Sequence, residues 1–212
     1  MSGNQNKAKR MSVDKDEPPA EGNTVRRQEV IDAVAAFFAR HGFHGVGTRA
    51  LADAVGIKVS SLYFHVKSKD HALAEVCHHG IDPPIDFVAQ AQALDKPLDQ
   101  KLKLYFELMY SQLLKEADYA IVFVSERKHL GGEERKQIDQ KLKRFRKALL
   151  SLFESAAASG ELHPDLTPRS ASFIMIGTIR NLTQLYTEGP FTDFAQFFDD
   201  SVKALIRSVS NR

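Results

Sequence analysis

The sequence lacks the features that stabilise secreted proteins and anchor membrane proteins. It contains one cysteine, Cys77, so an internal disulfide and a cysteine-cluster zinc site are both excluded. Its longest apolar runs, at 121–124 and 173–176, are far shorter than the roughly 20 residues that a membrane span requires. The first ten residues are polar and contain no apolar stretch of the kind found in a secretory signal. We therefore expect a soluble, cytoplasmic protein with no membrane partner.

A large excess of charge is also missing. The chain has 29 lysine and arginine residues against 27 acidic ones, which leaves a formal net charge of +2. This balance excludes a protein that coats nucleic acid with a uniformly basic surface, so any basic surface must be local. Because 43% of the 212 residues are apolar, the chain can form a substantial hydrophobic core.

What the chain does contain is a series of helical apolar patterns. Residues 1–23 are polar, include Pro18-Pro19 and show no apolar period, so we expect a flexible polar arm there. From Val25 onward, apolar residues recur at helical spacing, and glycine or proline separates the segments. The expected helices cover 25–41, two short pieces within 48–66, then 69–80, 98–115, 119–130, 133–158, 169–187 and 191–208. The pattern predicts an all-α fold of about nine helices, with one helix ending before Pro83-Pro84.

The two short helices around Gly56 form the most informative pattern. Apolar residues give each helix one inward side: Leu51, Ala52 and Val55 in the first, and Val59, Leu62 and Val66 in the second. A glycine between them can take the left-handed conformation that redirects the chain, as a helix-turn-helix requires. The outward face of the second helix is then short and polar, and it consists of Lys58, Ser60, Ser61, Tyr63 and His65. Small hydroxyls allow close approach to base edges, and longer side chains can donate to phosphates.

The ordered run from Thr48 to Leu73, TRALADAVGIKVSSLYFHVKSKDHAL, resembles the DNA-binding signature of TetR-family transcriptional repressors. The resemblance implies a DNA-binding domain over 24–80 and a helical ligand-binding and dimerisation domain over 81–212. It also implies a homodimer that a small-molecule inducer releases from a pseudo-palindromic duplex operator, with no cofactor. The implied DNA contacts come from Thr48, Arg49, Lys58, Val59, Ser60, Ser61, Tyr63, His65 and Lys69.

Some of these residues have simpler interpretations. Val59 departs from the family pattern, because family members often place a base-reading polar side chain at this position. A valine offers only apolar contact, either with a thymine methyl or with the core. Thr48 is also a candidate N-cap, and Ser60 and Ser61 are also candidates for solvated positions.

The second half of the chain is expected to form the dimer interface and a ligand cavity. The last two helices are apolar on wide faces, which favours a four-helix bundle between two copies. The resemblance places a ligand cavity among the middle helices, and aromatic or polar side chains that interrupt apolar helices are its candidate lining: Tyr105, Phe106, Met109, Phe123, Arg180 and Asn181. Such a cavity suits a largely apolar ligand with one or two polar anchors. The basic residues between Arg127 and Lys147 are interpreted as a solvated or dimer-rim face, and contact with an anionic ligand is the alternative.

Two other classes of function compete with this interpretation. Four potential metal ligands, His71, Glu75, His78 and Asp82, lie on one helix face, so a metal-responsive regulator is an alternative. A DNA-binding protein without any ligand is another. An enzyme is not expected, because the sequence has no Ser-His-acid order, no phosphate-binding glycine loop after a strand and no nucleophilic cysteine context.

Overall fold

The computed structural model describes residues 21–187 and 193–211, which form helices and the turns between them. The elements are α1 (Glu21–His41), α2 (Thr48–Val55), α3 (Val59–His65), α4 (Lys69–Ala93), α5 (Leu98–Glu126), the short 3-10 helix η1 (Arg127–His129), α6 (Gly132–Ala158), α7 (Pro168–Thr187) and α8 (Phe194–Val209). The expected all-α class is confirmed. Most of the expected polar arm 1–23 lies outside the described residues, but its last three residues belong to α1. None of the described helices has the length and apolarity that crossing a membrane requires.

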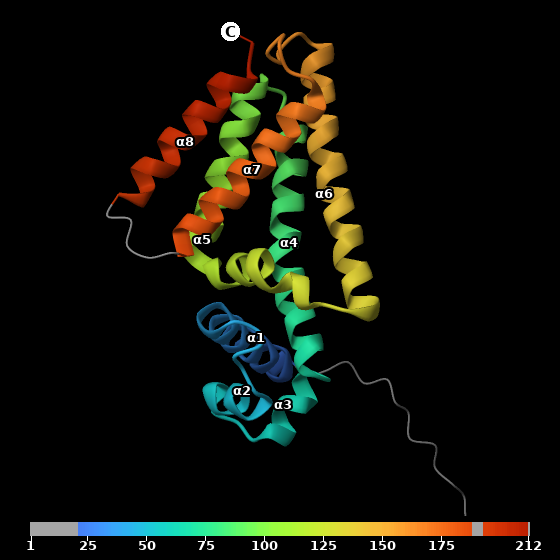
Figure 1. Ribbon diagram of the computed structural model, residues 1–212, viewed down its shortest axis with the longest axis vertical. Coiled ribbons are helices and arrows are strands. Elements are labelled where there is room, and N and C mark those ends of the chain that lie inside the picture. Colours follow the sequence, from blue (N-terminus) through green and yellow to red (C-terminus); the bar gives the residue numbers. More distant parts are fainter. Residues whose placement is uncertain (1–20, 188–192, 212) are drawn as a thin grey trace, which may run out of the picture.

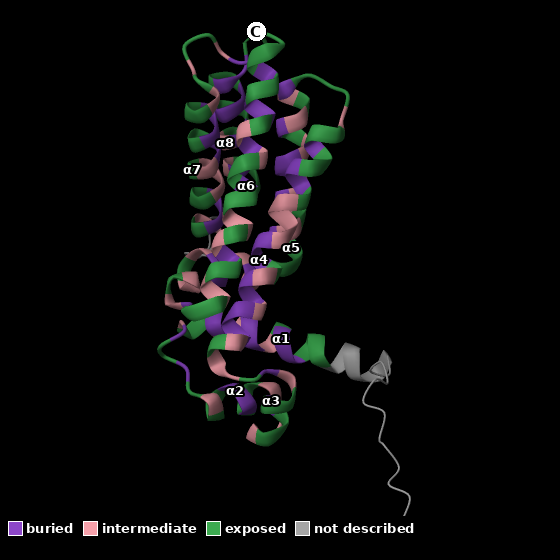
Figure 2. Ribbon diagram, turned by 90° about the vertical axis from the view of Figure 1, so that its right-hand side faces the viewer, coloured by how far each residue is buried: buried purple, intermediate pink, exposed green. Residues whose placement is uncertain are grey.

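The molecule has two parts, joined by α4 (Figure 1). Helices α1, α2 and α3 form a small head at one end, and α4 runs from this head into a long bundle with α5, α6, α7 and α8. Figure 2 shows that the buried residues follow α4 along most of its length. A movement of α4 would therefore displace residues in both the head and the bundle.

Helix α4 continues through Pro83-Pro84 to Ala93, so the expected helix end before these prolines is wrong. A proline inside a helix removes a backbone hydrogen bond and costs about 3 kcal/mol. The residues that follow offset this cost, because Phe87, Val88 and Ala91 are buried against the neighbouring helices. Packing in the bundle thus outweighs the local signal.

Helix α5 joins two of the expected helices, those over 98–115 and 119–130, and it bends at the break that the sequence predicts between them. The two segments form one element with a bend at Glu116, whose φ of −144° and ψ of 44° are not helical. After the bend, α5 runs across the end of the bundle next to α1 (Figure 1). The bend brings the end of α5 to the head.

The head is built around the expected helix-turn-helix. Gly56 ends α2 in the left-handed conformation, with φ of 74° and ψ of 29°, which confirms its role in the turn. Leu51, Leu62 and Val66 are buried against α1. The Ser68 hydroxyl accepts a hydrogen bond from the His71 amide at 3.0 Å, so α4 begins with the expected serine cap.

Candidate DNA-binding surface and ligand cavity

The outward face of α3 is exposed, as the sequence pattern predicts. Lys58, Ser60, Ser61 and Tyr63 are exposed, and Tyr63 retains 48% of its accessible surface. Val59 is half-buried and packs against the core, so its side chain is only partly available for contact with a base. Helix α3 and its N-cap thus present the Ser60 and Ser61 hydroxyls at the centre of the exposed face, with the Lys58 ammonium and the Tyr63 phenol at its margins.

Phe64, which was not among the expected DNA contacts, is 74% exposed and is the most exposed large apolar side chain among the described residues. At about 100° per residue, Phe64 lies on the side of α3 opposite the buried Leu62 and Val66. Its ring contacts the His65 ring edge-on, with the two ring centroids 5.4 Å apart. The helical phase alone could have placed Phe64 on the outward face.

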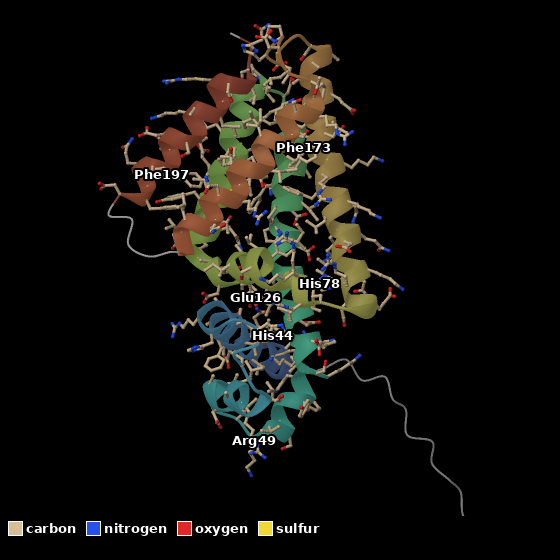
Figure 3. The ribbon with its side chains drawn as sticks, viewed as in Figure 1. His44, Arg49, His78, Glu126, Phe173 and Phe197 are labelled. Atoms are coloured by element: carbon tan, nitrogen blue, oxygen red, sulfur yellow. The ribbon has the colours of Figure 1, made fainter. Side chains whose placement is uncertain are left out.

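The flanking candidates lie at two different places around α3. Arg49 is exposed at the end of the head, and its side chain points away from the protein (Figure 3). Gly47, not Thr48, is the N-cap of α2, and Thr48 is half-buried in the first turn. The Lys69 ammonium lies 4.2 Å from the centroid of the Phe43 ring in the loop between α1 and α2, a cation–π contact that positions this cation.

Contacts between the head and the bundle were not anticipated from the sequence. The Glu126 carboxylate, at the end of α5, accepts a hydrogen bond from the Phe43 amide at 2.9 Å. The rings of His44 and His129 are joined by a hydrogen bond of 2.9 Å, and Figure 3 shows His44 and Glu126 at this junction. The Tyr119 hydroxyl donates to the Asp32 carboxylate of α1. These contacts fix the head to the second half of α5.

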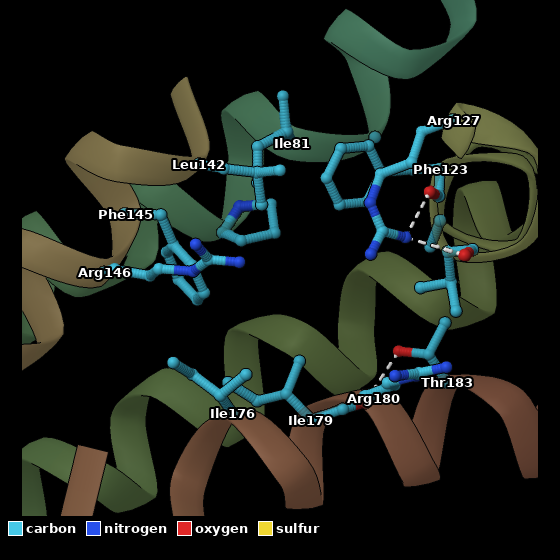
Figure 4. A pocket seen from close by; sticks show the side chains of 14 residues that line it. Ile81, Phe123, Arg127, Leu142, Phe145, Arg146, Ile176, Ile179, Arg180 and Thr183 are labelled. Carbon is cyan, nitrogen blue, oxygen red and sulfur yellow. Dashed lines mark hydrogen bonds between the residues drawn. The ribbon is translucent and has the colours of Figure 1, made fainter. Parts of the chain in front are cut away.

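The main cavity lies inside the bundle, between α4, α5, α6 and α7 (Figure 4). Its volume is about 200 Å³. The lining consists of Gly80, Ile81, Pro84, Ala120, Phe123, Val124, Arg127, Leu142, Phe145, Arg146, Ile176, Ile179, Arg180 and Thr183. It is therefore mostly apolar, with three arginines and no acidic side chain among the described residues that line it.

Arg127 is the most constrained of these arginines. Its guanidinium donates to the carbonyls of Phe123 at 2.9 Å and Val124 at 2.7 Å. Burial lowers the pKa of Arg127 from its ordinary value, and the nearby positive charge of Arg180 lowers it further. No carboxylate of the described chain forms an ion pair with Arg127, Arg146 or Arg180. The cavity thus holds positive charge that an anion would stabilise.

The expected cavity residues are distributed over four places. Phe123 and Arg180 line the main cavity, whereas Arg127 and Arg146 were not among the candidates. Tyr105 and Met109 line a second, smaller cavity of about 40 Å³. Phe106 is buried in the core between aromatic neighbours and lines neither cavity.

Asn181 lies in a groove between α7 and α8, outside both cavities. Beside it, Phe173 and Ile174 are 60% and 40% exposed, and Figure 3 shows Phe173 on α7 and Phe197 on α8. Wide apolar surface of this kind on a single chain is typical of a protein interface. The outward faces of α7 and α8 are therefore the candidate dimer surface.

The structure does not gather the four candidate metal ligands into a site. The Glu75 carboxylate lies 2.8 Å from Arg27 and 3.9 Å from His71, and Asp82 pairs with Lys141 at 2.7 Å. Burial, followed by the charge of Lys141, lowers the pKa of His78. Within the described residues, no group of three or more such side chains could hold a metal ion.

Two family models match the chain. Residues 30–76 match the model described as bacterial regulatory proteins, tetR family. Residues 95–207 match the model described as tetracyclin repressor-like, C-terminal domain, which is more than half of the chain. The two matches cover the head with the start of α4, and then most of the bundle.

Individual proteins agree with these models. The transcriptional repressor KstR2 of Rhodococcus jostii is 29% identical over 155 residues, which are 70% of this chain and 75% of KstR2. The solved structure of the ketosteroid regulator KstR2 of Mycobacterium tuberculosis has a TM-score of 0.77 at 21% identity and covers 88% of this chain and 96% of its own. The structure of AibR, solved with isovaleryl coenzyme A and operator DNA, has a TM-score of 0.74 at 21% identity. The match covers 85% of this chain and 98% of AibR.

The helix-turn-helix with its exposed polar face and the bundle with its cavity are thus the two parts that the family models describe. An exposed α3 is what DNA recognition requires. The chain belongs to the TetR family, and it is a DNA-binding transcriptional regulator and not an enzyme.

Proposed function

We propose that this regulator represses transcription as a homodimer on a pseudo-palindromic operator and that an acyl-coenzyme A thioester releases it. Operator contacts belong to residues 24–80, ligand binding and dimerisation belong to residues 81–212, and the protein acts in the cytoplasm. One observation carries the ligand proposal: Arg127, Arg146 and Arg180 surround an otherwise apolar cavity.

The chemistry of the cavity selects an amphiphilic anion. Apolar side chains such as Ile81, Phe145 and Ile176 suit an acyl chain, and guanidinium groups bind phosphate oxygens well because of their planar, multiple donors. A more polar cavity of about 340 Å³ adjoins the main one at Arg180 and includes Lys128 in its lining. A phosphorylated carrier fits this basic side, and AibR supports the ligand class because its structure holds an acyl-coenzyme A.

On the DNA side, the exposed residues of α3 enter the major groove. Ser60 and Ser61 approach base edges, and Val59 contributes apolar contact from its half-buried position. Phosphate contacts come from Thr48, Arg49, Lys58, Tyr63, His65 and Lys69. A seven-residue helix offers little contact area, so specific binding needs two copies about 34 Å apart along the duplex.

The second copy docks on the outward faces of α7 and α8. Phe173 and Ile174 are exposed there on the single chain, and the groove beside them is lined by small and apolar side chains such as Ala204 and Leu205. Burial of these side chains against a symmetry mate gives an isologous four-helix bundle. The distance between the two heads is then set by how each bundle holds its own head.

The ligand acts on that distance through the end of α5. Arg127 lines the cavity, and the preceding residue, Glu126, accepts the hydrogen bond of the Phe43 amide in the head. A ligand anion competes with the Phe123 and Val124 carbonyls for the Arg127 guanidinium. Once these carbonyls lose their donor, the end of α5 and η1 shifts, and the head follows.

Titration of isovaleryl-coenzyme A and of longer acyl-coenzyme A thioesters into the purified protein tests this proposal. We expect Arg146→Gln to weaken thioester binding about tenfold, since one charge-assisted contact is lost. Arg144→Gln is the matched control, because Arg144 is an exposed neighbour on α6 outside the cavity lining. Equal losses in the two variants, or no binding to the wild type, would reject the ligand class.

Titrations of zinc and of thioesters into the complex of the protein with its operator decide between the alternatives. Release of the operator by zinc, with no effect of any thioester, would favour a metal-responsive regulator. An operator affinity that neither zinc nor thioesters change would favour a DNA-binding protein without a ligand.

A further inference from the structure

One buried polar group near the main cavity lacks a partner. Tyr105 is 1% exposed, and its hydroxyl has no hydrogen-bond partner in the described structure. Burial raises the pKa of Tyr105, so the phenol stays protonated and can both donate and accept. A buried hydroxyl without a partner costs stability, and native proteins contain few of them.

The hydroxyl belongs to the second cavity, of about 40 Å³. This cavity shares Gly80, Pro84, Ala120, Ile179 and Thr183 with the main cavity, so the two lie side by side along α4, α5 and α7. None of the three arginines of the main cavity lines the second one. The second cavity therefore adjoins the main one along a shared wall that contains none of the three arginines.

Other polar side chains that line the second cavity already have partners in the protein. The Tyr119 hydroxyl donates to Asp32, and the Gln112 amide donates to Glu116 at 2.8 Å. The Thr183 hydroxyl donates to the Ile179 carbonyl at 2.9 Å. His79 also lines this cavity but is exposed, so Tyr105 is the buried group here whose hydrogen bond remains to be made.

We propose that the Tyr105 hydroxyl is a specificity contact for an oxygen atom at the far end of the ligand's acyl chain, so that the ligand is a hydroxy- or oxo-acyl thioester. This inference rests on the proposed function, since it requires the ligand's charged end to lie at the arginines. A cavity of about 40 Å³ admits a hydroxyl or carbonyl group next to Tyr105 and excludes a bulky substituent. An unsubstituted chain leaves the Tyr105 hydroxyl unpaired and binds less tightly.

Tyr105→Phe tests the inference, because it removes the hydroxyl and keeps the ring. Tyr110→Phe is the matched control, since Tyr110 lies on the same helix, packs on Phe194 and Phe198 and lines neither cavity. Without ligand, we expect Tyr105→Phe to melt at the wild-type temperature or above it. A clearly lower melting temperature, with the control unchanged, would show that the hydroxyl already has a partner and would overturn the inference.

The ligand titration uses pairs of ω-hydroxyacyl- and unsubstituted acyl-coenzyme A thioesters of increasing chain length. For the pair of matching length, we expect the wild type to bind the hydroxylated member about tenfold more tightly, and Tyr105→Phe to abolish this preference. Tyr110→Phe should keep it.

The outcomes distinguish a failure of the proposed role of Tyr105 from a failure of the proposed ligand class. If both members of every pair bind the wild type equally, the acyl-coenzyme A ligand stands and the role of Tyr105 is overturned. If no thioester of either kind binds, the proposed ligand class fails, and the inference fails with it.

Discussion

The head and the bundle expose their functional residues in opposite ways. On the head, the candidate DNA contacts lie on the outside of the seven-residue helix α3 and at the adjoining ends of α2 and α4, and most of them are solvent-exposed. In the bundle, the candidate ligand contacts point inward from four helices into a cavity. A surface that binds a large, rigid duplex needs no enclosure, whereas a small ligand gains affinity from being surrounded.

The head and the bundle also differ in which interactions stabilise their sites. The head depends on a tight turn and a few buried side chains, so its site is local in sequence. The cavity depends on close approach of long helices, such as α4 and α5 at Gly80. Substitutions near a site that is built from one short segment should therefore be tolerated better than substitutions near a cavity that is built from several helices.

The largest effect is expected on the proposed dimer surface. Ile174→Asp should separate the dimer and lower operator affinity about 10³-fold, to the level of non-specific binding. Ile174 is 40% exposed on the single chain, so the fold should survive in this variant. Leu114→Asp, at a leucine that is 59% exposed outside the groove, is the control. Sedimentation of wild type as a monomer that still binds the operator specifically would refute the dimer.

A second comparison substitutes one glycine in each part. A Cβ at Gly80 would lie 2.5 Å from the Tyr119 carbonyl oxygen and 2.6 Å from Phe123 Cβ, so Gly80→Ala should destabilise the protein by about 1–3 kcal/mol. A Cβ at Gly47 meets no atom within 4 Å, and Gly47→Ala should change the free energy of unfolding by at most about 0.5 kcal/mol. Chemical denaturation measures both, and similar losses would contradict the contrast between the parts.

Removal of basic side chains from the head should weaken DNA binding and leave the affinity for the ligand unchanged. Arg49→Ala and Lys69→Ala should each lower the salt slope of operator binding by about one unit. Tyr63→Phe should weaken binding with no change in slope, because no charge is lost. Lys103→Ala, at an exposed lysine on α5, is the control. Fluorescence anisotropy over a range of salt gives these slopes, and wild-type slopes in the first two variants would remove those residues from the interface.

The smallest effect concerns His78 in the bundle. Its pKa is lowered from the ordinary value of 6.5 by burial and then by Lys141, so the folded state favours the neutral ring. As the pH falls through 6.5, the unfolded chain takes up the proton more readily than the folded one, and stability decreases. His78→Gln should therefore flatten the dependence of Tm on pH between about 5 and 7. His163→Gln, in the loop after α6, should leave the wild-type dependence.

The sequence was sufficient for the head because its signals are local. Gly56, the inward apolar residues and the Ser68 cap are each defined within one or two turns, and all three were confirmed. Phe64 was missed although its helical phase places it outward. The outward face was expected to consist of polar side chains, and Phe64 was assigned to neither face.

The bundle was harder because its signals are long-range. Pro83-Pro84 carries a strong local signal for a helix end, but burial of later residues in α4 outweighs it. The sequence placed Phe123 and Arg180 correctly beside a cavity, yet it missed Arg127 and Arg146 and included Asn181, which lies in the outer groove. Which side of a helix faces a cavity depends on the positions of three other helices, and no single segment encodes those positions.

The central claim is that the cavity and the head are coupled, and one pair of titrations tests it most directly. Isovaleryl-coenzyme A, or a thioester that binds more tightly, is titrated into the protein with and without operator duplex. The account predicts that the duplex weakens thioester binding by the same factor by which the thioester weakens operator binding, about 5- to 150-fold or about 1–3 kcal/mol. Equal thioester affinities in the two titrations would contradict it.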